Sequence, residues 1–172
     1  MKLKKNQKKL ILVSIIVALL LVGATAYFKP EILNGLLNQS QSQSTKAFES
    51  KYLKFTVDLP GNFKALDESS MIVISSEWGE IYIARNGTQF NNLREYLDEF
   101  DRNTSLNFSE DLVMIDNYEA VLRKLTNSDI ENGQENIYFI FVENSVFKIS
   151  TTEEALFDEL DLIAKSFKYT GN

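Results

Sequence analysis

Cysteine and histidine are both absent from this chain of 172 residues. Without Cys there is no disulfide, thiolate nucleophile or zinc–thiolate site, and no thiol that could be acylated to make a lipoprotein. Without His, the chain lacks the side chain that most often acts as a general base near neutral pH or binds transition metals. No other motif specifies a reaction. We therefore predict that the protein is not an enzyme, and we assign it no catalytic, cofactor-binding or metal-binding residue and no cofactor.

Basic residues are scarce beyond position 46. Residues 1–46 carry seven lysines and one acid, a net charge of +6, whereas residues 47–172 carry 11 basic and 23 acidic residues, a net charge of −12. An acidic domain is repelled by phosphate backbones. Nucleic acid is thus excluded as a partner of the C-terminal part, which would also avoid an anionic membrane surface.

Charged residues are missing from residues 10–28, a run of 19 residues from Leu10 to Phe28 that follows five lysines in residues 1–9. A helix of this length spans roughly 28 Å, close to the hydrocarbon thickness of a bilayer. Lysines next to such a segment stay in the cytoplasm. We predict a basic cytoplasmic N-terminus (1–9) and a single transmembrane helix or uncleaved signal anchor (10–28) in the lipid bilayer, with the C-terminal domain outside the cell membrane.

The end of this run has a second interpretation. Ala24-Thr-Ala26 has the small-x-small form of a signal peptidase site, and cleavage after Ala26 would make the protein secreted. Tyr27 and Phe28, however, suit the aromatic belt at a membrane interface. The next segment has an apolar helical face that suits a membrane surface, formed by Ile32, Leu33, Leu36 and Leu37. These features favour the anchor, and secretion is the alternative.

Residues 29–50 contain the polar, low-complexity run NQSQSQST and are predicted to form a flexible tether. The folded domain is predicted to span residues 51–172. Its first half shows period-two alternation in residues 53–59, a Pro60-Gly61 turn and two further strands at 71–75 and 80–85. A helix follows, in which Asn92 caps the first turn together with Glu95, and it has an apolar stripe of Leu93, Tyr96, Leu97 and Phe100.

The second half begins with a polar loop over residues 101–111. Strands at 112–115 and 118–125 then form a hairpin around Asp116-Asn117. Residues 136–142 are apolar on both faces, which predicts a central strand, and residues 145–150 pair with it. Thr151 and Glu154 form a capping box for a last helix with the stripe Leu156, Leu160, Ile163 and Phe167. The order predicts an α+β fold: an antiparallel sheet of about six to seven strands with helices on both faces.

Four stretches of this domain resemble PsbP-like domains, over roughly residues 50–170. They are FTVDLPGNFKAL (55–66), MIDNYEAVLRKL (114–125), NIYFIFVENSVFKIST (136–151) and DELDLIAKSFKY (158–169). The resemblance implies that the domain is an α/β/α sandwich. It also implies that the protein is a bacterial relative, exported or membrane-anchored, of the extrinsic, non-enzymatic subunit of photosystem II. The chain departs from photosynthetic members in having no His, and in having Phe63 where Trp is often found. No functional residue is carried over.

Three groups of polar or acidic residues could form functional sites or could simply be part of the protein surface. The loop from Asp101 to Asp111 has alternating oxygen side chains, as in a calcium loop, but Leu106 and Leu112 stand where Gly and Glu are required, so a polar surface loop is favoured. An acidic helix face, in which Asp98 can pair with Arg102, is either solvated or a docking face for a basic partner; it comprises Glu95, Asp98, Glu99 and Asp101. The pair Glu77 and Glu80 flanks Trp78 and could act on a sugar, although Trp78 is favoured as a packing residue.

The favoured function is that of a membrane-anchored, extracytoplasmic accessory protein whose PsbP-like domain binds another envelope protein. The alternative is a secreted or surface domain that binds a small ligand or a cation.

Overall fold

The computed structural model describes residues 44–102, 107–126 and 133–171, which belong to one compact unit that begins at Ser44. The predicted transmembrane segment, the Ala26 cleavage site and the tether up to residue 43 lie outside the described residues. Within the described ranges, no helix is long and apolar enough to cross a membrane.

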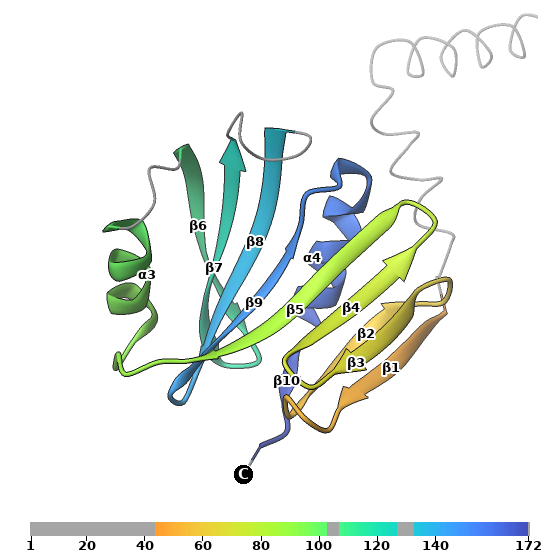
Figure 1. The fold of residues 1–172 in the computed structure, drawn as a ribbon, viewed down its shortest axis with the longest axis horizontal. Helices are drawn as coiled ribbons and strands as arrows, with labels where there is room; N and C mark the ends of the chain where they lie inside the picture. The colour runs from red at the N-terminus through yellow and green to blue at the C-terminus, as the bar shows by residue number, and fades with distance from the viewer. Residues whose placement is uncertain (1–43, 103–106, 127–132, 172) are drawn as a thin grey trace, which may run out of the picture. The chain divides into compact units, whose positions relative to one another are not determined.

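Two antiparallel sheets make up this unit (Figure 1). The small sheet has the order β1-β2-β10 and the large sheet the order β3-β4-β5-β9-β8-β7-β6. The small sheet contains β1 (Thr45–Ser50), β2 (Phe55–Pro60) and β10 (Lys168–Tyr169). The large sheet contains β3 (Lys64–Glu68), β4 (Met71–Ser76), β5 (Gly79–Gly87), β6 (Asn107–Ile115), β7 (Tyr118–Thr126), β8 (Gln134–Val142) and β9 (Ser145–Thr151). The predicted first strand, 53–59, therefore corresponds to β2 and belongs to the small sheet, while β3 was not predicted.

Strand β1 lies inside the range that we predicted to be a tether, so the folded domain begins six residues earlier than expected. Its first three residues are exposed, and this polar outer part resembles a linker. Pairing with β2 along its whole length, from Thr45 opposite Pro60 to Ser50 opposite Phe55, makes it a strand. Ser50 is fully buried, and its hydroxyl bonds to Asp67 and accepts the Leu53 amide.

The prediction of a central strand at 136–142 is confirmed by β8, which pairs with β9 on one side and β7 on the other. Its alternate residues enter two separate apolar clusters. Tyr138 and Ile140 join the main core, whereas Ile137 and Phe139 join a smaller cluster on the opposite face. Such a strand needs a packing layer on each face.

Two helices supply those layers. Helix α4 (Phe157–Lys165), which follows the short 3-10 turn η2 (Glu154–Leu156), packs against β2 and β9 and contributes Leu160 and Ile163 to the main core. Helix α3 (Leu93–Arg102) contributes Leu93 and Leu97 to the smaller cluster. The predicted arrangement of helices on both faces of the sheet is thus confirmed for the described domain.

The two predicted helix caps have different outcomes. The Asn92 side chain accepts the Glu95 amide at 2.9 Å, and the Glu95 carboxylate accepts the Asn91 amide, so the first cap is confirmed. The capping box at Thr151 is wrong. Thr151 ends β9, and its hydroxyl accepts the Glu153 amide and donates to the Glu80 carbonyl. Its hydroxyl therefore ties the end of β9 to β5 and is not free to cap a helix.

Candidate functional site

Helix α3 packs on the large sheet through the smaller apolar cluster, whose sheet residues come from β7, β8 and β9. Beside the helix, Leu112 and Met114 of β6 are 84% and 66% exposed. Leu112 lies opposite Val121 and Met114 opposite Glu119 on β7. Residues directly opposite in an antiparallel pair share one face, and Val121 belongs to the cluster under α3. The two exposed side chains are therefore on the same face as the helix.

A groove of about 440 Å³ lies between the N-terminal half of α3 and strands β6 and β7. We call it the β6 groove. Most of its lining side chains are apolar, and its charged residues are Arg94 and Glu119. The apolar lining includes Leu93, Leu97, Leu112, Met114 and Val121. An exposed apolar surface of this kind marks a binding site more often than a scattered surface residue does.

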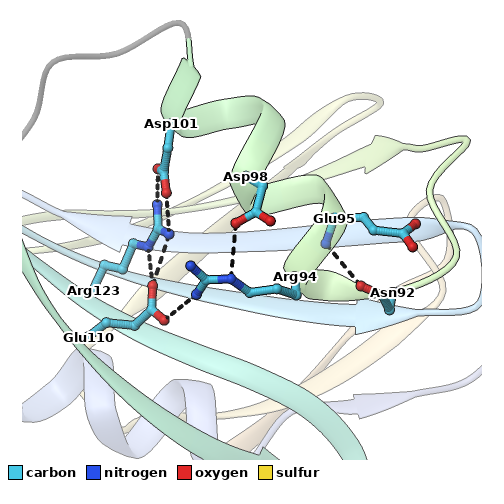
Figure 2. A network of polar contacts seen from close by, with 7 residues as sticks. All are labelled: Asn92, Arg94, Glu95, Asp98, Asp101, Glu110 and Arg123. Carbon is cyan, nitrogen blue, oxygen red and sulfur yellow. Dashed lines mark hydrogen bonds and ion pairs between the residues drawn. The ribbon is translucent and has the colours of Figure 1, made fainter.

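Arg123 fixes α3 beside this groove (Figure 2). It lies on β7, is 1% exposed, and its guanidinium contacts both carboxylate oxygens of Asp101 on α3 at 2.6 and 3.0 Å. It also binds Glu110 of β6 at 2.9 Å. The same guanidinium lies 4.1 Å from the Phe108 ring centroid and 5.7 Å from that of Phe139. One side chain therefore joins the helix, the edge strand and the middle of the sheet.

Arg94 extends this network along the helix. Its guanidinium binds Glu110 at 2.9 Å and Asp98, one turn further along, at 3.0 Å (Figure 2). Arg102, which we predicted to pair with Asp98, instead pairs with Glu99 at 2.8 Å. That prediction was wrong because Arg94, four residues before Asp98, takes its carboxylate.

The predicted polar loop over residues 101–111 is shorter than expected. Helix α3 continues to Arg102 and β6 already begins at Asn107, while residues 103–106 lie outside the described part. The candidate calcium-loop residue Asp101 is bound to Arg123. Among the residues that the structure describes, no group of three or more carboxylate, His or Cys side chains could hold a metal ion.

Of the two carboxylates that could act on a sugar, Glu80 has structural partners. Glu80 accepts hydrogen bonds from Tyr82 and Ser75. Trp78, which we favoured as a core or loop-packing residue, lies in the turn between β4 and β5 and is 50% exposed, so it is not a core residue. Its amide donates to the Ser76 hydroxyl. The tight β4–β5 turn places Trp78 at the surface.

A polar depression of about 320 Å³ lies on the opposite face, between α4 and strands β7 and β8. At its wall the Tyr138 hydroxyl donates to Asp161, and Lys165 donates to the same carboxylate at 2.6 Å. Burial and this hydrogen bond raise the pKa of Tyr138 above its usual range. Burial acts to raise the pKa of Asp161, but the hydrogen bonds from Lys165 and Tyr138 outweigh it and hold that pKa below its usual value. These groups satisfy one another, which leaves little reason to assign a ligand here.

Replacing Tyr138 with Phe is expected to lower the free energy of unfolding by about 1 kcal/mol at pH 8, because a hydrogen bond is lost. The folded-state pKa of Tyr138 is raised, so its contribution is complete below the unfolded pKa near 10 and is lost as the pH rises through the folded value. The difference between the two chains should thus shrink above about pH 10. Urea unfolding of both chains at a series of pH values measures this difference, and a difference that grows with pH would contradict it.

Sequence reasoning missed the β6 groove. The signal was present as alternation: Phe108, Glu110, Leu112 and Met114 occupy every second position, and all lie on the α3 face of β6. The polar residues between them led us to assign the first half of this strand to a loop.

Comparison with known proteins agrees with this architecture. No protein-family model matches the sequence, and no curated protein does. Among solved structures, the chain is similar to the solution structure of cyanobacterial PsbP (CyanoP) from Synechocystis sp. PCC 6803, with a TM-score of 0.50 and 9% sequence identity. The match covers 76% of this chain and 95% of the other. The described domain therefore has a PsbP-like fold, which confirms the resemblance found in the sequence.

Proposed function

We propose that this protein is a non-enzymatic accessory protein, anchored in the cell membrane by residues 10–28, whose PsbP-like domain binds another protein outside the cytoplasm. The observation that carries the proposal is the β6 groove, where apolar side chains remain exposed beside a helix that is firmly tied to the sheet. Proteins that work alone seldom retain such a surface.

The sequence supports the remaining parts of the proposal. The uncharged run of 19 residues after five lysines favours an anchor with the domain outside. The absence of Cys and His leaves few groups for catalysis, which favours binding over chemistry. The similarity to a PsbP structure supports the fold only.

Chemical cross-linking in intact cells tests the binding function without assuming a site. With the full-length chain, we expect one predominant cross-linked species that contains a second envelope protein. Its identity comes from mass spectrometry, and a chain with only residues 1–43, which end before the folded unit, serves as the control. If the full-length chain gives no adduct beyond those of the control, the binding function is wrong.

The predicted orientation can be tested by cysteine labelling, because any introduced thiol is the only one in the chain. In the Lys51→Cys variant, where position 51 is exposed, a membrane-impermeant maleimide should label intact cells. The matched Lys2→Cys variant should react only after the membrane is permeabilised, because residue 2 is expected in the cytoplasm. The reverse pattern would overturn the topology. Release of the Lys51→Cys chain into the medium would instead favour cleavage after Ala26.

A further inference from the structure

Strand β6 is one edge of the large sheet, and among the described strands it pairs only with β7 (Figure 1). It is nine residues long and pairs with β7 in continuous register from Asn107 to Ile115, without a bulge. It contains neither Pro nor Lys. Natural edge strands are usually shortened, bulged, or protected by Pro and Lys against pairing with another chain. β6 has none of these features, and of its two charged side chains, Glu110 is held by Arg94 and Arg123, which leaves Asp111.

The opposite edge of the same sheet shows the contrast. Strand β3 is only five residues long and carries Lys64, and its one exposed large apolar side chain is Leu66. On β6, in contrast, three large apolar side chains are exposed, namely Phe108, Leu112 and Met114. The unprotected edge is thus the one next to the β6 groove.

We propose that β6 accepts an extended segment of a partner protein as an added strand, and that this segment alternates apolar and basic residues. The inference rests on the proposed binding function and names the site and the chemistry of the partner. Main-chain hydrogen bonds to an edge strand provide affinity in this mode, while pockets for alternate side chains provide specificity.

The two faces of β6 define this alternation. On the α3 face, the exposed side chains of Leu112 and Met114 border the β6 groove, so the partner residues on that face should be apolar. On the other face, the exposed residue Asp111 lies opposite Leu122, which packs against the main core. A basic side chain beside Asp111 fits that face, and a strand presents successive residues to alternate faces.

Charge argues against a second copy of this chain as the occupant. Strand β6 carries two carboxylates, Glu110 and Asp111, and no basic residue. Glu110 is already paired with Arg94 and Arg123, but two β6 strands side by side would bring the exposed Asp111 of each copy to one seam, and neither strand would supply a cation. Residues 47–172 also have 23 acidic and 11 basic residues, which favours approach of a basic partner.

The probe is a fluorescent peptide of alternating Val and Lys, titrated into the full-length chain in nanodiscs of zwitterionic phosphatidylcholine, with protein-free nanodiscs as the blank. The first control is a peptide of the same composition and charge in which all Val residues precede all Lys residues. As a strand, this peptide cannot place Val on one face and Lys on the other. The second control is a peptide of alternating Val and Glu, which tests whether the partner segment must be basic. We expect the alternating Val and Lys peptide to bind at least about tenfold more tightly than either control.

The Leu112→Lys variant places a charge at the mouth of the groove, where the side chain is already 84% exposed and the fold should be unaffected. It should weaken binding of the alternating Val and Lys peptide by about tenfold or more. The matched Leu162→Lys variant makes the same change on α4, where Leu162 is 58% exposed, and should change affinity by less than about twofold. Circular dichroism spectra of both variants verify that they are folded.

Three results would overturn the inference: equal binding of the alternating and block peptides, equal binding to the Leu112→Lys chain, or self-association of the full-length chain that Leu112→Lys abolishes. The last result would make a second copy the occupant. Cross-linking in cells separates this failure from failure of the binding function. If the partner adduct persists in the Leu112→Lys chain, binding is right and the site is wrong, whereas absence of any adduct from the wild-type chain removes both.

Discussion

Replacing Arg123 with Met is expected to lower the free energy of unfolding by about 3 to 5 kcal/mol, the usual cost of removing one partner from a buried ion pair. Met preserves much of the side-chain volume but removes the charge. The side chains of Asp101 and Glu110 are only 28% and 20% exposed. Both would lose the Arg123 guanidinium, and only Glu110 would keep a second arginine, Arg94. Urea unfolding of the full-length chain in mild detergent, followed by near-ultraviolet circular dichroism, measures this loss.

Arg102 provides the matched control. It is also an arginine in an ion pair with a carboxylate, but its side chain is 72% exposed. Arg102→Met should therefore cost less than about 1 kcal/mol. Arg123→Lys should fall between the two, because Lys keeps the charge but cannot contact two carboxylates with a planar fork. Equal costs for Arg123→Met and Arg102→Met would show that burial does not strengthen the Arg123 network.

The location of the loss can be measured as well. Hydrogen exchange in the Arg123→Met chain should accelerate in α3 and β6, which Arg123 joins, before it accelerates in α4 on the opposite face. Uniform acceleration would mean that α3 does not open separately. Because α3 forms one wall of the β6 groove, peptide binding should fall in the same variant.

Periodicity in the sequence predicted the parts of the fold in which one residue pattern determines one structure. The apolar run at 136–142 predicted a strand covered on both faces, and β8 is such a strand. The hairpin at Asp116-Asn117 was equally clear, because both residues tolerate the positive φ values of 48° and 70° that its tight turn requires. Local chemistry determined these features.

The features that the sequence did not reveal depend on contacts between distant residues. From the sequence, Arg123 looks like an ordinary surface residue of an alternating strand. In the structure it is buried, because it pairs with the carboxylate of Asp101 on α3, 22 positions earlier. Likewise, β1 is a strand only because β2 pairs with it. The β6 groove lies alongside α3, between the helix and strands β6 and β7, and alternation alone does not reveal where a helix packs on its sheet.

Replacing Leu160 with Ala is expected to lower the free energy of unfolding by about 2 to 5 kcal/mol, the range for large-to-small changes in cores. Leu160 lies on α4, is fully buried and belongs to the main core between that helix and the sheets. The cost has two parts: loss of apolar burial, and a cavity that the surroundings fill only in part. The same urea unfolding experiment on the full-length chain measures it.

Leu162 provides the matched control for Leu160, because it is the same residue type two positions along the same helix and is 58% exposed. Leu162→Ala removes little packing, and Ala is the better helix former, so its cost should stay within about 0.5 kcal/mol of zero. A cost for Leu162→Ala close to that for Leu160→Ala would mean that both faces of α4 are packed in the intact protein. The outer face of α4 would then itself be an interface, and the assignment of the binding surface to the β6 side of the sheet would have to be revised.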